Sequence, residues 1–296
     1  MKYIDFLERK NYSKSVIIPA MFNAGLEKKA MLLAACGHFK EIAICQDCGD
    51  REFYGFNCCR DRFCPVCEKK RSLLWFAKLV PIVEDLISEG KIINMMTLTI
   101  PDEKDLKTSL KYLLGTWRNM THQNLKMSKE FKRRFIGGIR FLEIKRGKNS
   151  RLWHPHFHFI VVKDEKERDF DWLLDSWSRA YSLLTKQKVD CNVDIRPFKI
   201  KKKDDLLKSV LEVCKYVSKF DWMNENAQDI KEFVDSLKNI RSVSTWGIVR
   251  QRLKGDVEDE MDMPLLNLER LICKVCGSKN WDVLEGITSN YIRGLA

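Results

Sequence analysis

Three histidines alternate along one short stretch of the chain. They are His154, His156 and His158 in the segment HPHFHFIVVK, whose regular pattern predicts a β-strand. Side chains two residues apart on a strand lie on the same face, about 6.7 Å from one another. Neutral imidazoles on one face are good ligands for divalent metals. The alternative is a strand with three surface histidines, an unusual use of a chain that has only five. The spacing therefore favours a metal site.

A second reactive group lies on a predicted helix, in the segment SVLEVCKYVSKF. Glu212 and Tyr216 are four residues apart and Lys219 follows three residues later, so on a helix all three share a face. By itself, a tyrosine in such a helix is most simply a packing residue. Beside a metal that polarises a phosphoryl oxygen, it becomes a nucleophile able to form a covalent intermediate.

Cysteine spacing predicts a structural zinc site. The chain has eleven cysteines, an odd number, and its N-terminal sequence does not resemble a signal peptide, so metal binding is favoured over disulfides. Two C-x-x-C pairs are separated by residues 49–63, a spacing typical of a tetrahedral zinc site. The predicted ligands are Cys45, Cys48, Cys64 and Cys67. Cys58 and Cys59 lie between the pairs and are alternative ligands.

A further pair, Cys273 and Cys276, lies in the segment CKVCGSKNW near the C-terminus. It has the form of half a zinc ribbon, and no second half follows it. A second zinc site here needs ligands from elsewhere, and the candidates are Cys36, His38, Cys58 and Cys59. The alternative is a turn that binds no metal.

The composition indicates a folded, basic protein. The chain has 296 residues, 45% of them hydrophobic and 32% charged, which is typical of a globular protein. Its formal net charge of +12 favours a polyanionic partner such as nucleic acid. No apolar run reaches the ~18 residues needed to span a bilayer, so we expect a cytoplasmic protein without a membrane partner.

Hydrophobic periodicity predicts an α+β fold. Strands are expected at residues 92–100, 137–145, 154–163 and 191–198, and helices at 14–36, 68–90, 103–130, 168–185 and 204–220. Pro81 is expected to kink or split the second helix. From residue 92 the order is β-α-β-β-α-β-α, which suggests a ferredoxin-like antiparallel sheet.

We predict three regions along the chain. Residues 1–72 form a helical segment with the zinc-binding module, residues 73–222 form the α/β domain, and residues 223–296 form a helical and basic segment. In the third region an acidic linker, DVEDEMD at 256–262, precedes the last cysteine pair.

The combined motifs resemble those of the HUH endonucleases. His156-Phe157-His158 matches their pair of histidines around one bulky apolar residue, and Tyr216 to Lys219 matches their YxxK helix. Within that superfamily the chain is similar to the single-tyrosine replication initiators of rolling-circle plasmids. The matching segments are RFCPVCEKKRS, TLTI, RFLEIK, HPHFHFIVV and EVCKYVSK, in that order. The resemblance covers residues 45–250 and implies an HUH nuclease core.

The resemblance also implies a metal-dependent nickase. His156 and His158 would hold Mg²⁺ or Mn²⁺ on the scissile phosphate. The third ligand would be Glu143, because family members often carry an acidic residue there and carboxylates suit these cations. His154 is the competing candidate.

The roles of the helix residues follow from the same resemblance. Tyr216 would attack the double-strand origin, keep the 5′-phosphate as a phosphotyrosine and release a 3′-hydroxyl primer. Glu212 would activate water for the terminating cleavage, and Lys219 would steady the phosphate or the phenolate.

The implied partner is plasmid origin DNA, as a single-stranded or hairpin nick site, with host helicase and polymerase; a homodimer is compatible. Basic residues expected to contact DNA are Lys201, Lys202, Lys203, Arg62 and Lys145. The alternative for such charges is an ordinary solvated surface.

Two rival functions are a relaxase or single-tyrosine transposase, and a non-catalytic zinc-dependent DNA-binding regulator. Relaxases place the nucleophile near the N-terminus, where Tyr3 and Tyr12 lack a neighbour like Glu212. The complete set of His156, His158, Glu212 and Tyr216 argues against a non-catalytic regulator.

Overall fold

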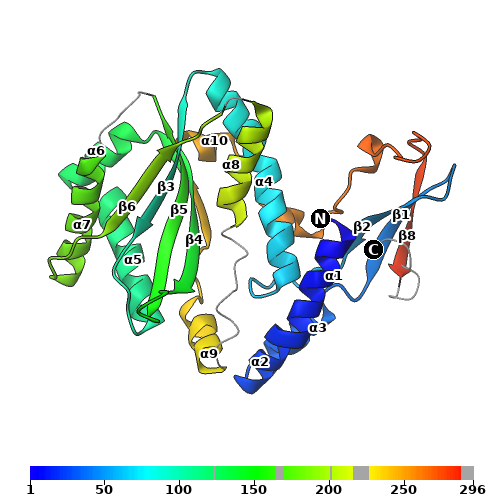
Figure 1. The fold of residues 1–296 in the computed structure, drawn as a ribbon, viewed down its shortest axis with the longest axis horizontal. Helices are drawn as coiled ribbons and strands as arrows, with labels where there is room; N and C mark the ends of the chain where they lie inside the picture. Colours follow the sequence, from blue (N-terminus) through cyan, green and yellow to red (C-terminus); the bar gives the residue numbers. More distant parts are fainter. Residues whose placement is uncertain (123, 165–169, 201, 216–226, 288–296) are drawn as a thin grey trace. The chain divides into compact units, whose positions relative to one another are not determined.

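The computed structural model describes residues 1–122, 124–164, 170–200, 202–215 and 227–287. These residues form two compact units (Figure 1). The N-terminal unit contains Met1–Leu74 together with residues 227–231 and 255–287. The central unit contains the described residues between positions 75 and 222, together with Glu232–Lys254. The predicted third region, 223–296, therefore does not form a unit of its own, because its parts pack with both of the others.

The central unit is built on a five-stranded sheet with the order β6-β3-β5-β4-β7. Every neighbouring pair of strands is antiparallel. The strands are β3 (Ile92–Thr99), β4 (Gly137–Arg146), β5 (Trp153–Lys163), β6 (Asn192–Pro197) and β7 (Val243–Trp246). The helices are α5 (Leu106–Thr121), α6 (Lys126–Arg134), α7 (Asp171–Thr185), α8 (Lys203–Cys214) and α10 (Gly247–Arg252), and α9 (Ala227–Ser236) crosses between the units. The four predicted strands and the α+β class are confirmed.

An aromatic core holds one face of this sheet against α5 and α7, which lie on the same side of it in Figure 1. Phe157 and Phe159 of β5 are fully buried. Their rings lie 6.1 and 5.0 Å from the ring of Trp117 on α5. Trp177 on α7 donates its indole N–H to the carbonyl oxygen of Thr99, at 2.7 Å. Because side chains alternate along a strand, these contacts leave the histidines of β5 on the opposite face.

The opposite face is covered by α8 and by the part of α4 (Pro65–Ser88) that belongs to the central unit. The ring of Trp75 on α4 contacts the ring of Phe141, with centroids 6.3 Å apart. Phe141 pairs with His158 across β4 and β5, so this contact is on the histidine face. Helix α8 contacts β5 and buries Leu206 and Val210. The histidines therefore lie in a layer closed by helices.

The N-terminal unit combines helices with a three-stranded antiparallel sheet, in the order β2-β1-β8. The strands are β1 (Lys40–Cys45), β2 (Arg51–Phe56) and β8 (Trp281–Ile287). The helical segments are α1 (Tyr3–Tyr12), a π-helical turn (Ser13–Ile17), α2 (Ile18–Asn23) and α3 (Glu27–Ala35). The buried ring of Phe6 lies 5.0 Å from the rings of Phe53 and Phe56, which holds α1 on this sheet.

The acidic segment 256–262 is not a linker. Val257 and Met261 are buried, and Glu258 forms a two-point ion pair with Arg71, at 2.6 and 3.1 Å. Lys70 donates to the carbonyl oxygen of Met263 at 2.7 Å. The segment is therefore packed into the N-terminal unit through both apolar and ionic contacts.

Several predicted helices have different limits. The helix predicted at 14–36 begins earlier and is broken by a turn around Gly25, whose φ of +70° favours glycine. Pro81 does not split α4, which continues through it from Pro65 to Ser88. The helix predicted at 103–130 is two helices, α5 and α6. Strands β1, β2, β7 and β8 were not predicted.

Gly247 provides a test of the central fold. It joins β7 to α10 with φ of +55°, and an added Cβ would lie 2.0 Å from the carbonyl oxygen of Ile136. Gly90 has φ of +79° with open space around it. Gly90→Ala should therefore cost about 1–2 kcal/mol, from backbone strain alone, and Gly247→Ala should cost more because the backbone must also move. Urea denaturation of both variants measures the difference, and equal losses of stability would contradict this packing.

Candidate functional site

Three side chains converge on the helix-covered face of the central sheet. The register of β4 and β5 places Glu143 directly opposite His156, with His158 two residues further along β5. Glu143 Oε2 lies 2.5 Å from His156 Nε2 and 2.9 Å from His158 Nε2. Glu143, His156 and His158 have exposed fractions of 3%, 2% and 6%. Their ligand atoms all lie within 4.8 Å of one another, a grouping that can hold a metal ion.

The Nδ1 atoms of both imidazoles also have hydrogen-bond partners. His158 Nδ1 lies 3.0 Å from Thr97 Oγ1, and Thr97 faces His158 across β3 and β5. His156 Nδ1 lies 3.1 Å from the carbonyl oxygen of His154. Such contacts fix ring orientation and leave Nε2 directed at a shared point, as is common around metal-binding histidines.

The hydrogen count at His156 is compatible with a bound cation. Both of its ring nitrogens face acceptors, a carbonyl oxygen and a carboxylate, but a neutral imidazole has only one N–H to donate. The doubly protonated ring would satisfy both, yet burial lowers the pKa of His156 and disfavours that form. A divalent cation held by Nε2 and Glu143 would remove the conflict, because Nδ1–H would then donate to the carbonyl oxygen.

The electrostatics of the cluster suit a cation. Burial lowers the pKa of His158 to about 4, although the Glu143 carboxylate acts in the opposite direction. Burial would raise the pKa of Glu143, but hydrogen bonds and charge from the two imidazoles outweigh it and keep the pKa low. Near neutral pH the cluster therefore holds two neutral imidazoles and one carboxylate, the nitrogen and oxygen ligands that divalent metals prefer.

His154 lies beside this cluster without joining it. Its Nδ1 is 2.5 Å from Asp102 Oδ1, and the Asp102 carboxylate also accepts a hydrogen bond from Ser150. Of the two candidates for the third position, the structure thus brings Glu143, and not His154, to the two histidines.

The predicted helix residues are only partly described. Glu212 lies near the end of α8, with 47% of its side chain exposed, and pairs with Lys215 at 3.1 Å. Tyr216 and Lys219 lie outside the described residues. Val213 and Cys214, at the end of α8, are buried.

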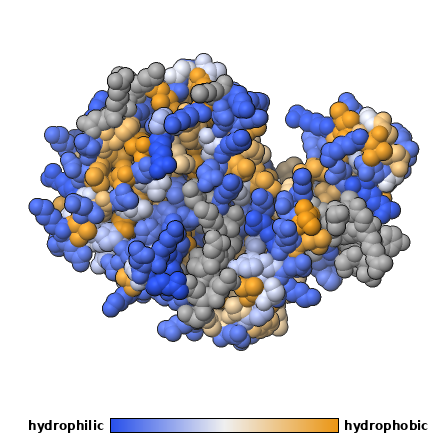
Figure 2. Space-filling model, in the orientation of Figure 1, coloured by the Kyte–Doolittle hydropathy of each residue, from blue (hydrophilic) through white to orange (hydrophobic). Residues whose placement is uncertain are grey.

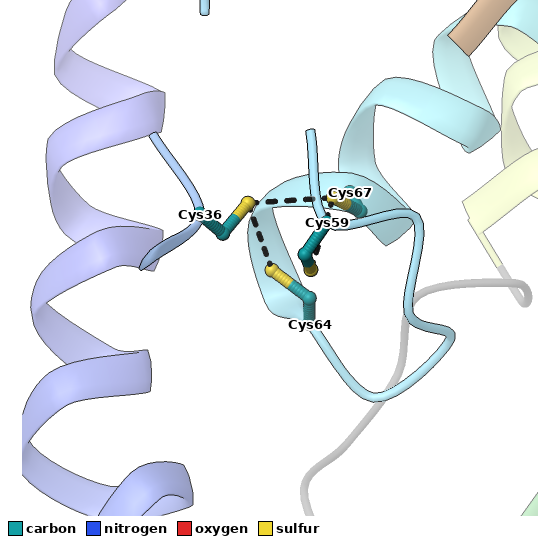
Figure 3. A group of neighbouring side chains, drawn as sticks. All are labelled: Cys36, Cys59, Cys64 and Cys67. Atoms are coloured by element: carbon teal, nitrogen blue, oxygen red, sulfur yellow. Dashed lines mark hydrogen bonds between the residues drawn. The ribbon is translucent and has the colours of Figure 1, made fainter. Parts of the chain in front are cut away.

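The predicted cysteine site corresponds to two separate clusters. Cys64 and Cys67, at the start of α4, meet Cys36, which follows α3, and Cys59, from the preceding loop (Figure 3). Cys36 Sγ lies 3.5 Å from Sγ of Cys64 and of Cys67, and the Cys59–Cys67 distance is 3.6 Å. Of the two alternative ligands between the pairs, Cys59 joins this cluster. We call it the helix-end cluster.

The other predicted pair, Cys45 and Cys48, meets Cys273 and Cys276. The prediction that Cys45 and Cys48 share one site with Cys64 and Cys67 is therefore wrong. The grouping differs because of a pairing between strands far apart in the sequence. Cys45 ends β1, and β8 pairs with β1 so that Cys45 lies opposite Trp281. This brings the C-terminal cysteine pair next to the first one. We call this group the strand-end cluster.

The basic residues expected at DNA have varied surroundings. Lys145 lies 3.8 Å from Glu143, Lys203 pairs with Glu84 at 3.0 Å, and Lys202 is exposed. Burial lowers the pKa of Arg62, which is half-buried, and Lys201 lies outside the described residues. Hydrophilic side chains cover most of the face drawn in Figure 2. Among the described helices, none is long and apolar enough to cross a membrane.

Comparison with known proteins identifies the family. The profile of a family described as "Replication protein" (Rep_1) matches residues 50–271. A protein named "Protein rep" from Lentilactobacillus hilgardii is 24% identical over 254 residues, which cover 82% of this chain and 80% of the relative. Proteins of the same name from a Bacillus species and from Streptococcus pneumoniae serotype 2 are 26% and 25% identical. The matched residues make up 78% and 70% of this chain, and 83% and 66% of the two relatives. No solved structure matches. Because the matched residues make up more than half of the chain, the protein belongs to the Rep_1 family of replication proteins.

Proposed function

We propose that this protein initiates rolling-circle replication of a plasmid by nicking one strand of the double-strand origin, with Tyr216 as nucleophile. The observation that carries the proposal is the buried cluster of Glu143, His156 and His158 on an antiparallel sheet, in a member of a replication protein family. Origin DNA is then the substrate, and host helicase and polymerase are the partners that strand displacement requires.

The strand order supports an HUH nuclease core of the ferredoxin-like type. Within the β-α-β-β-α-β segment, the two β-α-β units are interleaved: β5 lies between β3 and β4, and β3 lies between β6 and β5. This interleaving is what the split β-α-β arrangement produces. It places β4 beside β5, where Glu143 and the histidines meet.

Glu143, His156 and His158 are the proposed ligands of Mg²⁺ or Mn²⁺. The bound cation would polarise a phosphoryl oxygen of the scissile phosphate and offset its developing charge. The protein's own contribution is to hold the two Nε2 atoms and one carboxylate oxygen in fixed positions. Thr97 and the carbonyl oxygen of His154 fix the rings from behind.

The proposed reaction transfers a phosphoryl group to tyrosine. Oη of Tyr216 attacks phosphorus, a P–Oη bond forms, and the P–O3′ bond breaks. The phenolic proton is replaced by phosphorus, and a proton goes to the departing 3′ oxygen. Lys219 would steady the charge on the phosphate or the phenolate. Glu212, at the end of α8, would later remove a proton from water for the hydrolytic cut that ends the round.

A second group of proposals concerns zinc and DNA. The helix-end cluster would bind a structural Zn²⁺ that joins α3 to the start of α4. Lys145 and Lys202, with exposed side chains, are the described candidates to contact backbone phosphates of the origin.

The first functional test removes the histidines. His156→Ala combined with His158→Ala should lower nicking of a single-stranded origin oligonucleotide by at least about 100-fold, because ligand loss removes the metal. Binding to duplex origin DNA should be kept, because it depends on phosphate and groove contacts. His122→Ala, an exposed histidine of the same unit, is the matched control. A double variant that nicks at the wild-type rate would contradict the proposed site.

The metal site should also keep its affinity in mildly acidic solution. Burial lowers the pKa of His158 to about 4 and also lowers that of His156. His158 therefore stays neutral as the pH falls from 7 to 5.5, and His156 is harder to protonate than an ordinary histidine. Protons would compete with metal only below that range. An ordinary histidine, with a pKa near 6.5, would lose roughly tenfold in affinity per imidazole over the same interval. Electron paramagnetic resonance of Mn²⁺ titrated into the full chain at both pH values should show nearly equal affinities. A loss of tenfold or more would show that the imidazoles titrate normally.

The last functional test separates Tyr216 from Glu212. Tyr216→Phe removes only the hydroxyl and should abolish the covalent protein–DNA adduct. Glu212→Ala should still form the adduct and nick, but it should lose the hydrolytic cut, so products longer than one plasmid unit should accumulate. Glu212→Gln keeps the size of the side chain and should behave like Glu212→Ala if the carboxylate acts as a base. Labelled origin oligonucleotides and denaturing protein gels read both steps. An adduct in Tyr216→Phe would place the nucleophile elsewhere, with Tyr3 and Tyr12 next in line.

A further inference from the structure

Two turns of the N-terminal unit repeat the same structure far apart in the sequence. Both have the sequence C-x-x-C-G, and the glycines, Gly49 and Gly277, share a φ of +75°. In the first turn the N–H of Gly49 donates to the carbonyl oxygen of Cys45, and the N–H of Cys45 donates to that of Asp50, both at 2.8 Å.

The second turn has the corresponding bonds. The N–H of Gly277 donates to the carbonyl oxygen of Cys273 at 2.9 Å, and the N–H of Cys273 donates to that of Ser278 at 2.8 Å. The second thiol of each turn also accepts a backbone N–H from the residue two positions later, which is Asp50 for Cys48 and Ser278 for Cys276. The two turns are thus equivalent half-sites.

The four thiols of these turns have the separations of a metal site. Cys45 Sγ lies 3.5 Å from Cys276 Sγ, and Cys48 Sγ lies 3.5 Å from Cys273 Sγ. A disulfide requires about 2.05 Å, and all four cysteines are free. A tetrahedral ion with sulfur ligands at about 2.3 Å sets the sulfur atoms roughly 3.8 Å apart.

We propose that the strand-end cluster of Cys45, Cys48, Cys273 and Cys276 binds a second zinc ion, independent of the helix-end cluster. Four sulfur ligands in a closed tetrahedral arrangement select zinc among the common divalent metals and leave no position for substrate. The site is therefore structural. All four ligands lie outside residues 50–271, the part of the chain that the replication protein profile matches.

The second ion fastens the C-terminal part of the chain to the N-terminal sheet. Cys48 and Cys273 are separated by 225 positions, and β8 begins five residues after Cys276. The N–H of Gln46 donates to the carbonyl oxygen of Asn280 at 2.9 Å, so the metal site and the first β1–β8 contacts are adjacent. Zinc at this point closes a loop that includes the whole central unit.

Metal content tests the proposal, using the full chain purified without chelators. Wild-type protein should contain two zinc ions per chain. Cys276→Ser should contain one, and so should Cys59→Ser, which removes a ligand of the helix-end cluster. Cys276→Ser with Cys59→Ser should contain none. Val275→Ser is the matched control, because Val275 is an exposed residue of the same turn and carries no thiol; this variant should keep both ions.

A second measurement needs only wild-type protein and so does not depend on a variant that folds. Co²⁺ added to the metal-free chain should develop the absorption of tetrahedral cobalt bound to thiolates up to two equivalents. Cobalt bound by Glu143, His156 and His158 has no thiolate ligand and adds nothing to that absorption. Saturation of the thiolate absorption at one equivalent, one zinc ion in wild type, or two ions in Cys276→Ser would each overturn the proposal. Nicking plays no part in these measurements, so their outcome is separate from that of the proposed function.

Discussion

The antiparallel register of β4 and β5 is the constraint on which the candidate site depends. It sets Glu143 opposite His156 and Phe141 opposite His158. A shift of one residue would turn Glu143 to the aromatic face and remove the only carboxylate of the cluster. The same register is held from the other face, where Phe157 and Phe159 pack on Trp117. The hydrophobic packing of one face thus fixes the chemistry of the other.

Burial makes this arrangement costly without a cation. A carboxylate removed from water must be compensated by charge or by hydrogen bonds, and Glu143 has two imidazoles whose charged forms burial disfavours. His156 cannot satisfy both of its acceptors as a neutral ring. A divalent ion would provide the missing positive charge and the missing partner together. The helices that cover this face therefore shield the site from water and also favour a bound cation there.

Local sequence patterns predicted much of the central unit and less of the N-terminal unit. The alternation in HPHFH predicted a strand with the histidines on one face. The resemblance to a known family added Glu143 as the third residue of the predicted metal site. The pairing of the cysteines could not be read in this way. Equal C-x-x-C spacings suited a single site, but the partner of Cys45 and Cys48 arrives from the C-terminus through the pairing of β1 with β8. The repeated glycine after Cys48 and Cys276 was the available signal, since it marks both turns as the same half-site.

Ion pairs within the N-terminal unit limit how far the net charge of +12 can be taken as a DNA-binding surface. Arg71 is held by Glu68 and Glu258, and Arg60 pairs with Asp262. The acidic segment 256–262 therefore pairs with arginines that would otherwise add to the positive charge of this unit's surface. An internally paired arginine contributes little to phosphate binding, because its release would leave a carboxylate unpaired. Among the described residues, Lys202, which is exposed in the central unit, remains better suited to phosphate. The strand-end cluster and the acidic segment bring the C-terminal part of the described chain against its N-terminal part. We expect recognition of backbone phosphates to fall to the central unit, beside the proposed metal.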